Sequence, residues 1–308
     1  MNQPYDLAPE DLADESVRKI LRRLFGLLHS NVEGVLENDD VEFLHDFRVA
    51  NRRTRTVLSQ IRGVLPSSVM DTFPPEFKWL GDVTGPRRDL DVMLLEMDSI
   101  RNQSAIDDDA LGPLRIFLKE KLRLEHDLVQ AALQSKRFQR LIENWGRFLD
   151  TGGGEGVWPP LASSPIIELA GPRILRAYRR MWKRGAGIGI KPPATLLHRL
   201  RIDGKKLRYL LEFFTELYSA ATISRFIGEL KKLQDILGDF NDTEVQLALI
   251  EEFRDQGSPS AETRTAASDL AEAITERHFQ LRSEFAERFE SFSSDESRQL
   301  YKRTFKVT

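Results

Sequence analysis

Two short stretches of the chain concentrate side chains that could bind a phosphate-rich ligand. "LHDFRVANRRTRTVL" at 44–58 places one histidine and four arginines within eleven residues. "LHRLRIDGKKLRYLL" at 197–211 again follows a histidine with arginines and lysines. The planar arginine fork can donate two parallel hydrogen bonds to phosphate oxygens, and lysine supplies a compact positive charge. The two stretches therefore predict a binding site for a polyanion.

The overall charge of the chain hides this concentration. The windows 45–62 and 198–210 together hold ten Lys and Arg residues against two Asp, whereas the 308-residue chain has a formal net charge of −3. The rest of the chain must therefore be acidic. A basic locus within an acidic protein favours one specific polyanion site over general adhesion to nucleic acid.

Helical geometry would align the basic side chains of each stretch. Over 42–64, an α-helix would gather four of them into an arc of about 80° that runs about 15 Å along the axis. They are His45, Arg48, Arg52 and Arg55. The corresponding side chains of a helix over 195–218 are His198, Arg201, Lys205 and Arg208. Because apolar residues occupy the opposite faces, we expect each helix to bury one face and present a cationic stripe.

The chain repeats itself beyond these stretches. The basic motif recurs at an offset of 153 residues, and the same offset relates Gly85 to Gly238 and Asp89 to Asp242. One offset held across two separate motifs indicates two copies of one unit. We therefore expect a first repeat over 1–150, a Gly/Pro linker over 151–163 and a second repeat over 164–308.

The spacing of apolar residues predicts an all-α chain. Helical periodicity dominates, and the alternating pattern of half-buried strands is hard to find. Gly- and Pro-rich segments such as 65–75 and 84–89 separate the predicted helices, and short connections favour helical bundles. The helices are predicted at 17–36, 42–64, 110–149, 165–184, 195–218, 222–237 and 262–290.

Several classes of site and location are disfavoured. The chain has no cysteine, which excludes disulfides and thiolate sites. No apolar run approaches the roughly 18 residues of a membrane span, and the N-terminus lacks the apolar core of a secretory signal, so we expect a cytoplasmic protein without a membrane partner. The single histidines His29, His126 and His278 have no partner at metal-ligand spacing. The tryptophans do not interleave with the basic stripes, which makes nucleic acid an unfavoured partner.

With these motifs in view, the chain resembles the CHAD family of helical domains. The likeness lies in H-x-x-R-[VI]-x-x-x-[RK]-[RK]-x-R at 45–55 and 198–208, and in "LGDVTGPRRDLDVML" and "LGDFNDTEVQL" further along. The resemblance implies two four-helix bundles related by an internal pseudo-two-fold axis, with a basic central pore that binds inorganic polyphosphate. Carried over by motif position, the ligand-facing residues would be His45, Arg48, Arg52, Arg53, Arg55, His198, Arg201, Lys205, Lys206 and Arg208. Further pore residues on the first helix of each half would be Arg22, Arg23, Arg176, Arg179 and Arg180.

We accordingly expect a non-catalytic polyphosphate binder without metal or cofactor, associated with polyphosphate granules. One alternative is a metal-dependent poly- or triphosphatase. The acidic residues that could serve it are Asp89, Asp91, Asp242 and Glu244. Carboxylates two residues apart diverge by about 200° on a helix, so a capping or arginine-tethering role is favoured, with Asp89 expected beside Arg52 or Arg53. The other alternative is an adaptor for nucleic acid or a phosphorylated protein.

Overall fold

The computed structural model describes residues 4–103, 106–152, 157–186, 188–189, 192–256 and 259–306, with side chains omitted at 101–103. Within these ranges the chain is helical and forms no strand, so the predicted all-α class is confirmed. None of the described helices combines the length and apolar character that crossing a membrane requires.

In its described residues, the first half of the chain forms seven α-helices. They are α1 (Ala13–Ser30), α2 (Val32–Glu37), α3 (Val41–Gln60), α4 (Ser67–Val83), α5 (Gly85–Gln103), α6 (Asp108–Leu133) and α7 (Lys136–Thr151). The second half begins with the short 3₁₀ helix η1 (Pro160–Ser163) and has another, η2 (Thr215–Leu217). Its α-helices are α8 (Ile166–Gly185), α9 (Ala194–Phe213), α10 (Ala220–Gln256), α11 (Ala261–Phe292) and α12 (Asp295–Phe305).

The two halves differ where one proline interrupts a helix. In the first half, α4 ends at Val83 and α5 starts at Gly85, directly before Pro86. Proline has no N–H to donate to the carbonyl four residues back, so it favours the first turn of a new helix. The position equivalent to Pro86 in the second half is Asp239, and there α10 continues without a break for 37 residues.

The predicted helix boundaries need several corrections. The helix expected over 17–36 is divided at Asn31 into α1 and α2, and most of the segment 84–89, expected to break helical structure, lies in α5. The helix expected over 110–149 is divided, because Ser135 caps the start of α7 by accepting a hydrogen bond from the Phe138 N–H. The segment 65–75 was expected to break helical structure, yet most of it lies in α4, whose buried Phe73 and Phe77 pack on Trp145. The helix predicted over 222–237 extends to Gln256.

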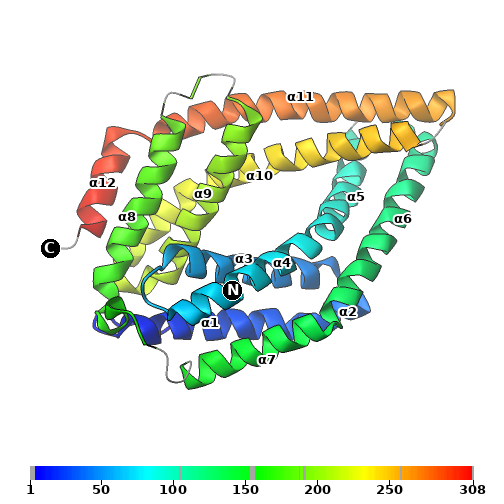
Figure 1. Cartoon of the computed structure of the whole chain (residues 1–308). Helices are drawn as coiled ribbons and strands as arrows, with labels where there is room; N and C mark the ends of the chain where they lie inside the picture. Colours follow the sequence, from blue (N-terminus) through cyan, green and yellow to red (C-terminus); the bar gives the residue numbers. More distant parts are fainter. Residues whose placement is uncertain are drawn as a thin grey trace.

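Both halves contribute to each of two apolar cores. The larger core joins α1, α3 and α7 to α8, α9 and α12 through residues such as Phe47 and Leu207. The smaller core joins α5 and α6 to α10 and α11, at the end of the molecule drawn on the right of Figure 1. The start of α1 also lies beside the start of α8, where the Ala13 N–H donates to the Ser164 carbonyl at 2.9 Å. The halves are therefore packed together at both ends, which fixes the position of α3 relative to α9. The predicted division into 1–150, 151–163 and 164–308 stays a prediction, and residues 153–156 of that linker lie outside the described residues.

Candidate functional site

The two basic stretches lie on neighbouring helices, α3 and α9, which are in contact. The side chain of Asp40 caps α3 by accepting a hydrogen bond from the Glu42 N–H at 2.9 Å. The apolar faces predicted for the two helices are buried, with Phe47 on α3 and Leu200 on α9 fully enclosed. Because these faces are fixed in the core, the basic stripes are held in defined directions.

A direct hydrogen bond links the two stripes. The Nε of Arg52 on α3 donates to the hydroxyl of Tyr209 on α9 at 2.8 Å, and Tyr209 is only 1% exposed. Burial lowers the pKa values of Arg201 and Lys205 on α9, and the positive charge of Arg52 lowers them further. We refer to Arg48, Arg52, Arg201 and Lys205 as the cationic cluster.

Arg48 is held at the break between α4 and α5. Its Nη1 donates to the Gly81 carbonyl at 3.0 Å and to the Thr84 hydroxyl at 2.7 Å. Burial, followed by the charge of Arg52, lowers the pKa of Arg48 to about 10. Both acceptors of Arg48 are neutral, so they orient the guanidinium without neutralising it.

Lys205 is the most strongly perturbed member of the cationic cluster. Burial, followed by the charges of Arg52 and Arg201, lowers its pKa to about 6. A lysine with this pKa is mostly neutral at pH 7, because surrounding cations and limited hydration both disfavour its charged form. An anion bound beside Lys205 would reverse this preference.

Two aspartates lie beside the cluster, one from each half. Asp242 approaches Arg201 to 4.0 Å, the outer limit of an ion pair. Asp89 keeps contact with solvent, but burial raises the pKa of its carboxyl and the charge of Arg48 opposes that rise. The negative charge of Asp242 adds to the rise in the Asp89 pKa. Asp89 was expected beside Arg52 or Arg53, whereas the charge that acts on it most strongly is that of Arg48.

Other arginines in the same helices have carboxylate partners and lie outside the cluster. Arg53 is 8% exposed, pairs with Glu212 at 3.1 Å and lies over the ring of Phe213. Glu212 also pairs with Arg208 at 3.2 Å. Arg53 therefore stabilises the contact between α3 and α9, whereas Arg208 pairs with Glu212 within α9 and adds to the positive charge that acts on Lys205. The structure does not bring the guanidinium of Arg53 together with the cationic cluster.

The remaining motif residues lie around the cluster. Arg55 contributes to the electrostatic lowering of the Arg48 pKa and, with Arg180, of the Lys206 pKa. The pKa of His45 is lowered by burial and then by the charge of Arg88, so its imidazole is neutral at pH 7. His198 is exposed, and its Nδ1 lies 3.2 Å from Oδ1 of Asn241.

Four of the five residues predicted on the first helix of each half are directed elsewhere. Arg22 donates to the Leu149 carbonyl at the end of α7, and Arg23 donates to the Pro4 carbonyl. Arg176 lines a hollow beside Glu168, and Arg179 lines a different one against α12. Arg180 is electrostatically coupled to a motif residue, because its charge lowers the pKa of Lys206 after the larger effect of burial.

The acidic residues considered for metal binding are not assembled into one group. Asp91 is buried and forms an ion pair with Arg87 at 3.3 Å. Glu244 influences the pKa of His278, away from Asp89. Among the described residues, no three histidine or acidic side chains are arranged so that they could hold a metal ion.

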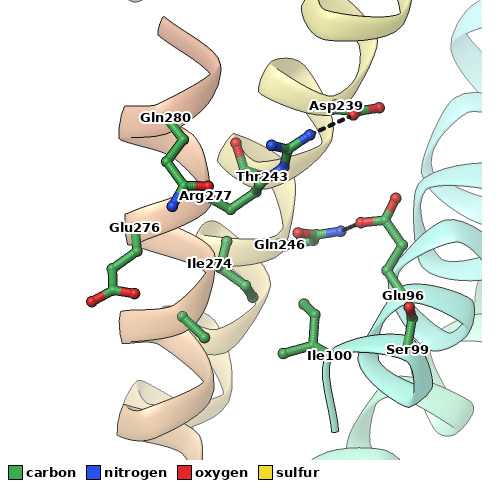
Figure 2. Close-up of a pocket in the computed structure, with 11 residues that line it drawn as sticks. Glu96, Ser99, Ile100, Asp239, Thr243, Gln246, Ile274, Glu276, Arg277 and Gln280 are labelled. Atoms are coloured by element: carbon green, nitrogen blue, oxygen red, sulfur yellow. Dashed lines mark hydrogen bonds and ion pairs between the residues drawn. The ribbon is translucent and has the colours of Figure 1, made fainter. Parts of the chain in front are cut away.

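A separate, acid-lined cavity of about 450 Å³ lies between α5, α10 and α11. Figure 2 shows Arg277 directed at Asp239, with which it pairs at 3.3 Å, and the amide of Gln246 directed at Glu96. Burial raises the pKa values of both Glu96 and Asp239. With Arg277 as its one cation, this cavity is poorly suited to a polyanion.

The sequence reasoning missed the residues that orient the cluster. Tyr209 and Thr84 provide these contacts, yet neither lies at a position that the periodic pattern distinguishes. Tyr209 directly follows Arg208, but its role requires knowing that α3 lies alongside α9. Only the constant offset between the repeats hinted at such a pairing.

Comparisons with known proteins identify the family and the fold of the chain. The family model described as "CHAD domain" matches residues 19–251. A crystal structure of the CHAD domain from the plant Ricinus communis is similar, with 26% identity, a TM-score of 0.78 and coverage of 94% of this chain and 95% of that one. PptA from Streptomyces chartreusis shares the fold, with 15% identity, a TM-score of 0.71 and coverage of 91% and 100%. No curated protein matches the chain. Since the family model covers more than half of its length, the chain belongs to the CHAD domain family.

Proposed function

We propose that the protein binds inorganic polyphosphate through the cationic cluster and the basic residues around it. One observation carries this proposal. Arg48 and Arg52 are oriented by a carbonyl and by hydroxyls, and within the described ranges Lys205 forms no ion pair. Of the four cations, Arg201 is the one within ion-pair distance of a carboxylate among the described residues, with Asp242 at 4.0 Å, while Asp89 acts on Arg48 from further away. Adjacent cations held without counter-charge are destabilising unless an anion offsets them, so the arrangement is best suited to a ligand.

Polyphosphate suits this cluster because its charges are closely spaced along a flexible chain. Consecutive phosphate groups could accept hydrogen bonds from Arg48 and Arg52 on α3 and from Arg201 on α9 without any base or protein portion in the ligand. The resemblance to the CHAD family implies the same ligand. We assign the binding residues to the cluster together with Arg55, Lys206, Arg180 and the two histidines, and we leave Arg53 and Arg208 with their structural partner Glu212.

The proposed role is binding without catalysis, in the cytoplasm and at polyphosphate granules. Nothing in the cluster resembles a nucleophile with its activating base, and Asp89 and Asp242 are explained as partners of Arg48 and Arg201. A fluorescent fusion should follow polyphosphate granules in cells, and the variant described next should be diffuse.

The test is a calorimetric titration with polyphosphate of defined length. Arg48→Glu combined with Arg201→Glu should weaken binding by about 100-fold or more, because two attractive contacts become repulsive. Lys231→Glu with Lys232→Glu makes the same change in net charge at two exposed positions on α10 and should retain nearly all of the affinity. Circular dichroism checks that the helices persist, and Arg48→Gln with Arg201→Gln is the milder pair if they do not.

Equal losses in the two double variants would mean that only net charge matters and would refute the assigned site. Single-stranded nucleic acid at equal phosphate concentration serves as competitor. Preferential binding of nucleic acid would replace polyphosphate as the ligand and favour an adaptor role.

A further inference from the structure

Helix α8 carries its positive charge on one broad face that spans an arc of about 140° around the axis. Its twenty residues include six Lys and Arg side chains and one acid, Glu168. Figure 1 shows α8 between α9 and the C-terminal helix α12, and α8 contacts both. Arg180 is coupled to Lys206 on α9, whereas Arg179 and Lys183 face α12. Arg179 and Lys183 therefore lie on the side of α8 turned away from the cationic cluster, and binding at that cluster does not account for their charge.

These residues line a pocket of about 260 Å³ between α8 and α12. Four of its seven lining residues are cations and none is acidic; the cations are Arg179, Lys183, Arg298 and Lys302. The other three form an apolar and aromatic floor of Leu175, Tyr178 and Trp182.

The charge of this pocket is almost uncompensated. Within the part of the chain that the structure describes, Arg179, Lys183 and Lys302 form no ion pair. Arg298 has a single one, with Asp295 at 3.9 Å, and the Asp295 side chain is 90% exposed. Such a pair contributes little, because water screens it and the side chains remain mobile. Arg298 is instead positioned over the ring of Trp182, 4.9 Å from its centroid.

Tyr178, which lines the pocket, and its neighbour Tyr301 both carry buried hydroxyls that have no hydrogen-bond partner among the described residues. Tyr178 is 2% exposed and stacks on Tyr301 with ring centroids 3.9 Å apart. A buried polar group without a partner is costly, so an oxygen that accepts from it would offset that cost. The indole N–H of Trp182 already donates to the Ser293 carbonyl at 3.1 Å.

The size of the pocket limits what it can hold. Sites for drug-sized ligands usually measure about 300–1,000 Å³, so 260 Å³ suits a compact anion better than a whole nucleotide. We propose that the pocket between α8 and α12 is a second anion site that binds a phosphate group, through its four cations and the Tyr178 hydroxyl. The group is either free phosphate or part of a polyphosphate chain. This inference does not depend on the ligand assigned to the cationic cluster.

The experiment uses tripolyphosphate and the full chain carrying Arg48→Glu and Arg201→Glu, which isolates the second pocket. Calorimetry should still detect one binding site, and adding Lys183→Gln with Lys302→Gln should weaken it by at least about tenfold. Adding Lys119→Gln with Lys136→Gln instead, at exposed positions on α6 and α7, should change the affinity by less than about twofold. Equal affinity in these two variants would overturn the proposal.

Tyr178→Phe separates a binding role from a structural one. Loss of the hydroxyl should weaken tripolyphosphate binding by about threefold or more while leaving the thermal midpoint unchanged or higher, since no protein contact is lost. Unchanged binding would remove the hydroxyl from the site.

Orthophosphate, titrated in parallel, distinguishes the two sources of the phosphate group. An affinity equal to that of tripolyphosphate indicates free phosphate, and a much weaker affinity indicates a polyphosphate segment. If the protein with Arg48→Glu and Arg201→Glu keeps full affinity for long-chain polyphosphate, the assignment of the cationic cluster fails, while the result for the pocket between α8 and α12 still stands.

Discussion

Arg52 of α3 donates a hydrogen bond from Nε to the hydroxyl of Tyr209 of α9 at 2.8 Å, which joins the two copies of the basic motif. Among the described residues this is the one hydrogen bond of the Arg52 side chain, and the charge of Arg52 adds to the effect of burial in lowering the pKa values of Arg201 and Lys205. Tyr209 is therefore a positioning residue rather than a ligand contact.

Removing this hydroxyl should weaken polyphosphate binding without unfolding the protein. In Tyr209→Phe, Arg52 loses its anchor, and we expect a loss of affinity of about three- to tenfold with a decrease in the free energy of unfolding of about 1 kcal/mol. Tyr218→Phe is the matched control, because the hydroxyl of Tyr218 contacts no cation of the cluster. Calorimetry and thermal denaturation measure the two effects, and identical affinities in the two variants would contradict the positioning role.

Glu212 should matter for stability rather than for binding. Glu212→Gln leaves the nearly buried Arg53 and the half-buried Arg208 without their shared carboxylate, so the free energy of unfolding should fall by about 2–3 kcal/mol. Urea denaturation measures this change. The affinity of the folded protein for polyphosphate should stay within about twofold of wild type. If Glu212→Gln weakened polyphosphate binding as much as Arg48→Glu with Arg201→Glu does, Arg53 would have to be counted among the binding residues.

Replacing Lys205 by methionine should stabilise the ligand-free protein in a pH-dependent way. The folded pKa of Lys205 is about 6, below its ordinary value of 10.5, so between these pH values the unfolded chain holds a proton that the folded protein lacks. The free energy of unfolding of the wild type therefore rises with pH across this window. Below pH 6 the folded protein bears the full cost of burying the charged Lys205 side chain. We expect Lys205→Met to gain about 1–3 kcal/mol at pH 7 and to lose this advantage as the pH approaches 10.5.

The same variant tests whether the ligand recharges Lys205. At pH 7.5 wild-type protein should take up close to one proton per bound polyphosphate, because an anion raises the depressed pKa again. Titrations in two buffers of different ionisation enthalpy measure this uptake. Lys205→Met should show clearly less uptake, and an unchanged value would exclude Lys205 from the site.

Asp242 distinguishes a binder from a metal-dependent phosphatase. As a partial counter-ion of Arg201, it competes with phosphate, so Asp242→Asn should strengthen polyphosphate binding by about threefold. In a phosphatase, the same change would abolish release of orthophosphate in the presence of Mg²⁺ or Mn²⁺. We expect no release from wild type or variant. Turnover that Asp242→Asn removes would establish the enzymatic alternative.

The part of the site that follows from local periodicity could be predicted from the sequence. Arg48 and Arg52 share one arc of α3, and the structure places both in the cluster. Arg53 follows Arg52 by about 100° around the helix, outside that arc, and accordingly points into the contact with α9. It was included only because the family motif contains it.

Features that depend on the packing of distant segments could not be read from the sequence. Because of Pro74 and Pro75, the sequence predicted a break over 65–75, yet these prolines lie inside α4, whose apolar residues pack against α7. The basic residues of α8 form one continuous pattern in the sequence, yet Arg180 faces α9 while Arg179 faces α12. Only the positions of α9 and α12 on either side of α8 separate these roles.

A double-mutant cycle between Arg52 and Arg201 tests most directly whether the two repeats form one site. Polyphosphate affinity is measured for wild type, Arg52→Gln, Arg201→Gln and the double variant. Because the two charges would contact the same bound chain, we predict a coupling free energy of at least about 0.5 kcal/mol. Losses that add to within about 0.3 kcal/mol would mean that the two helices bind independently, and would contradict a shared site.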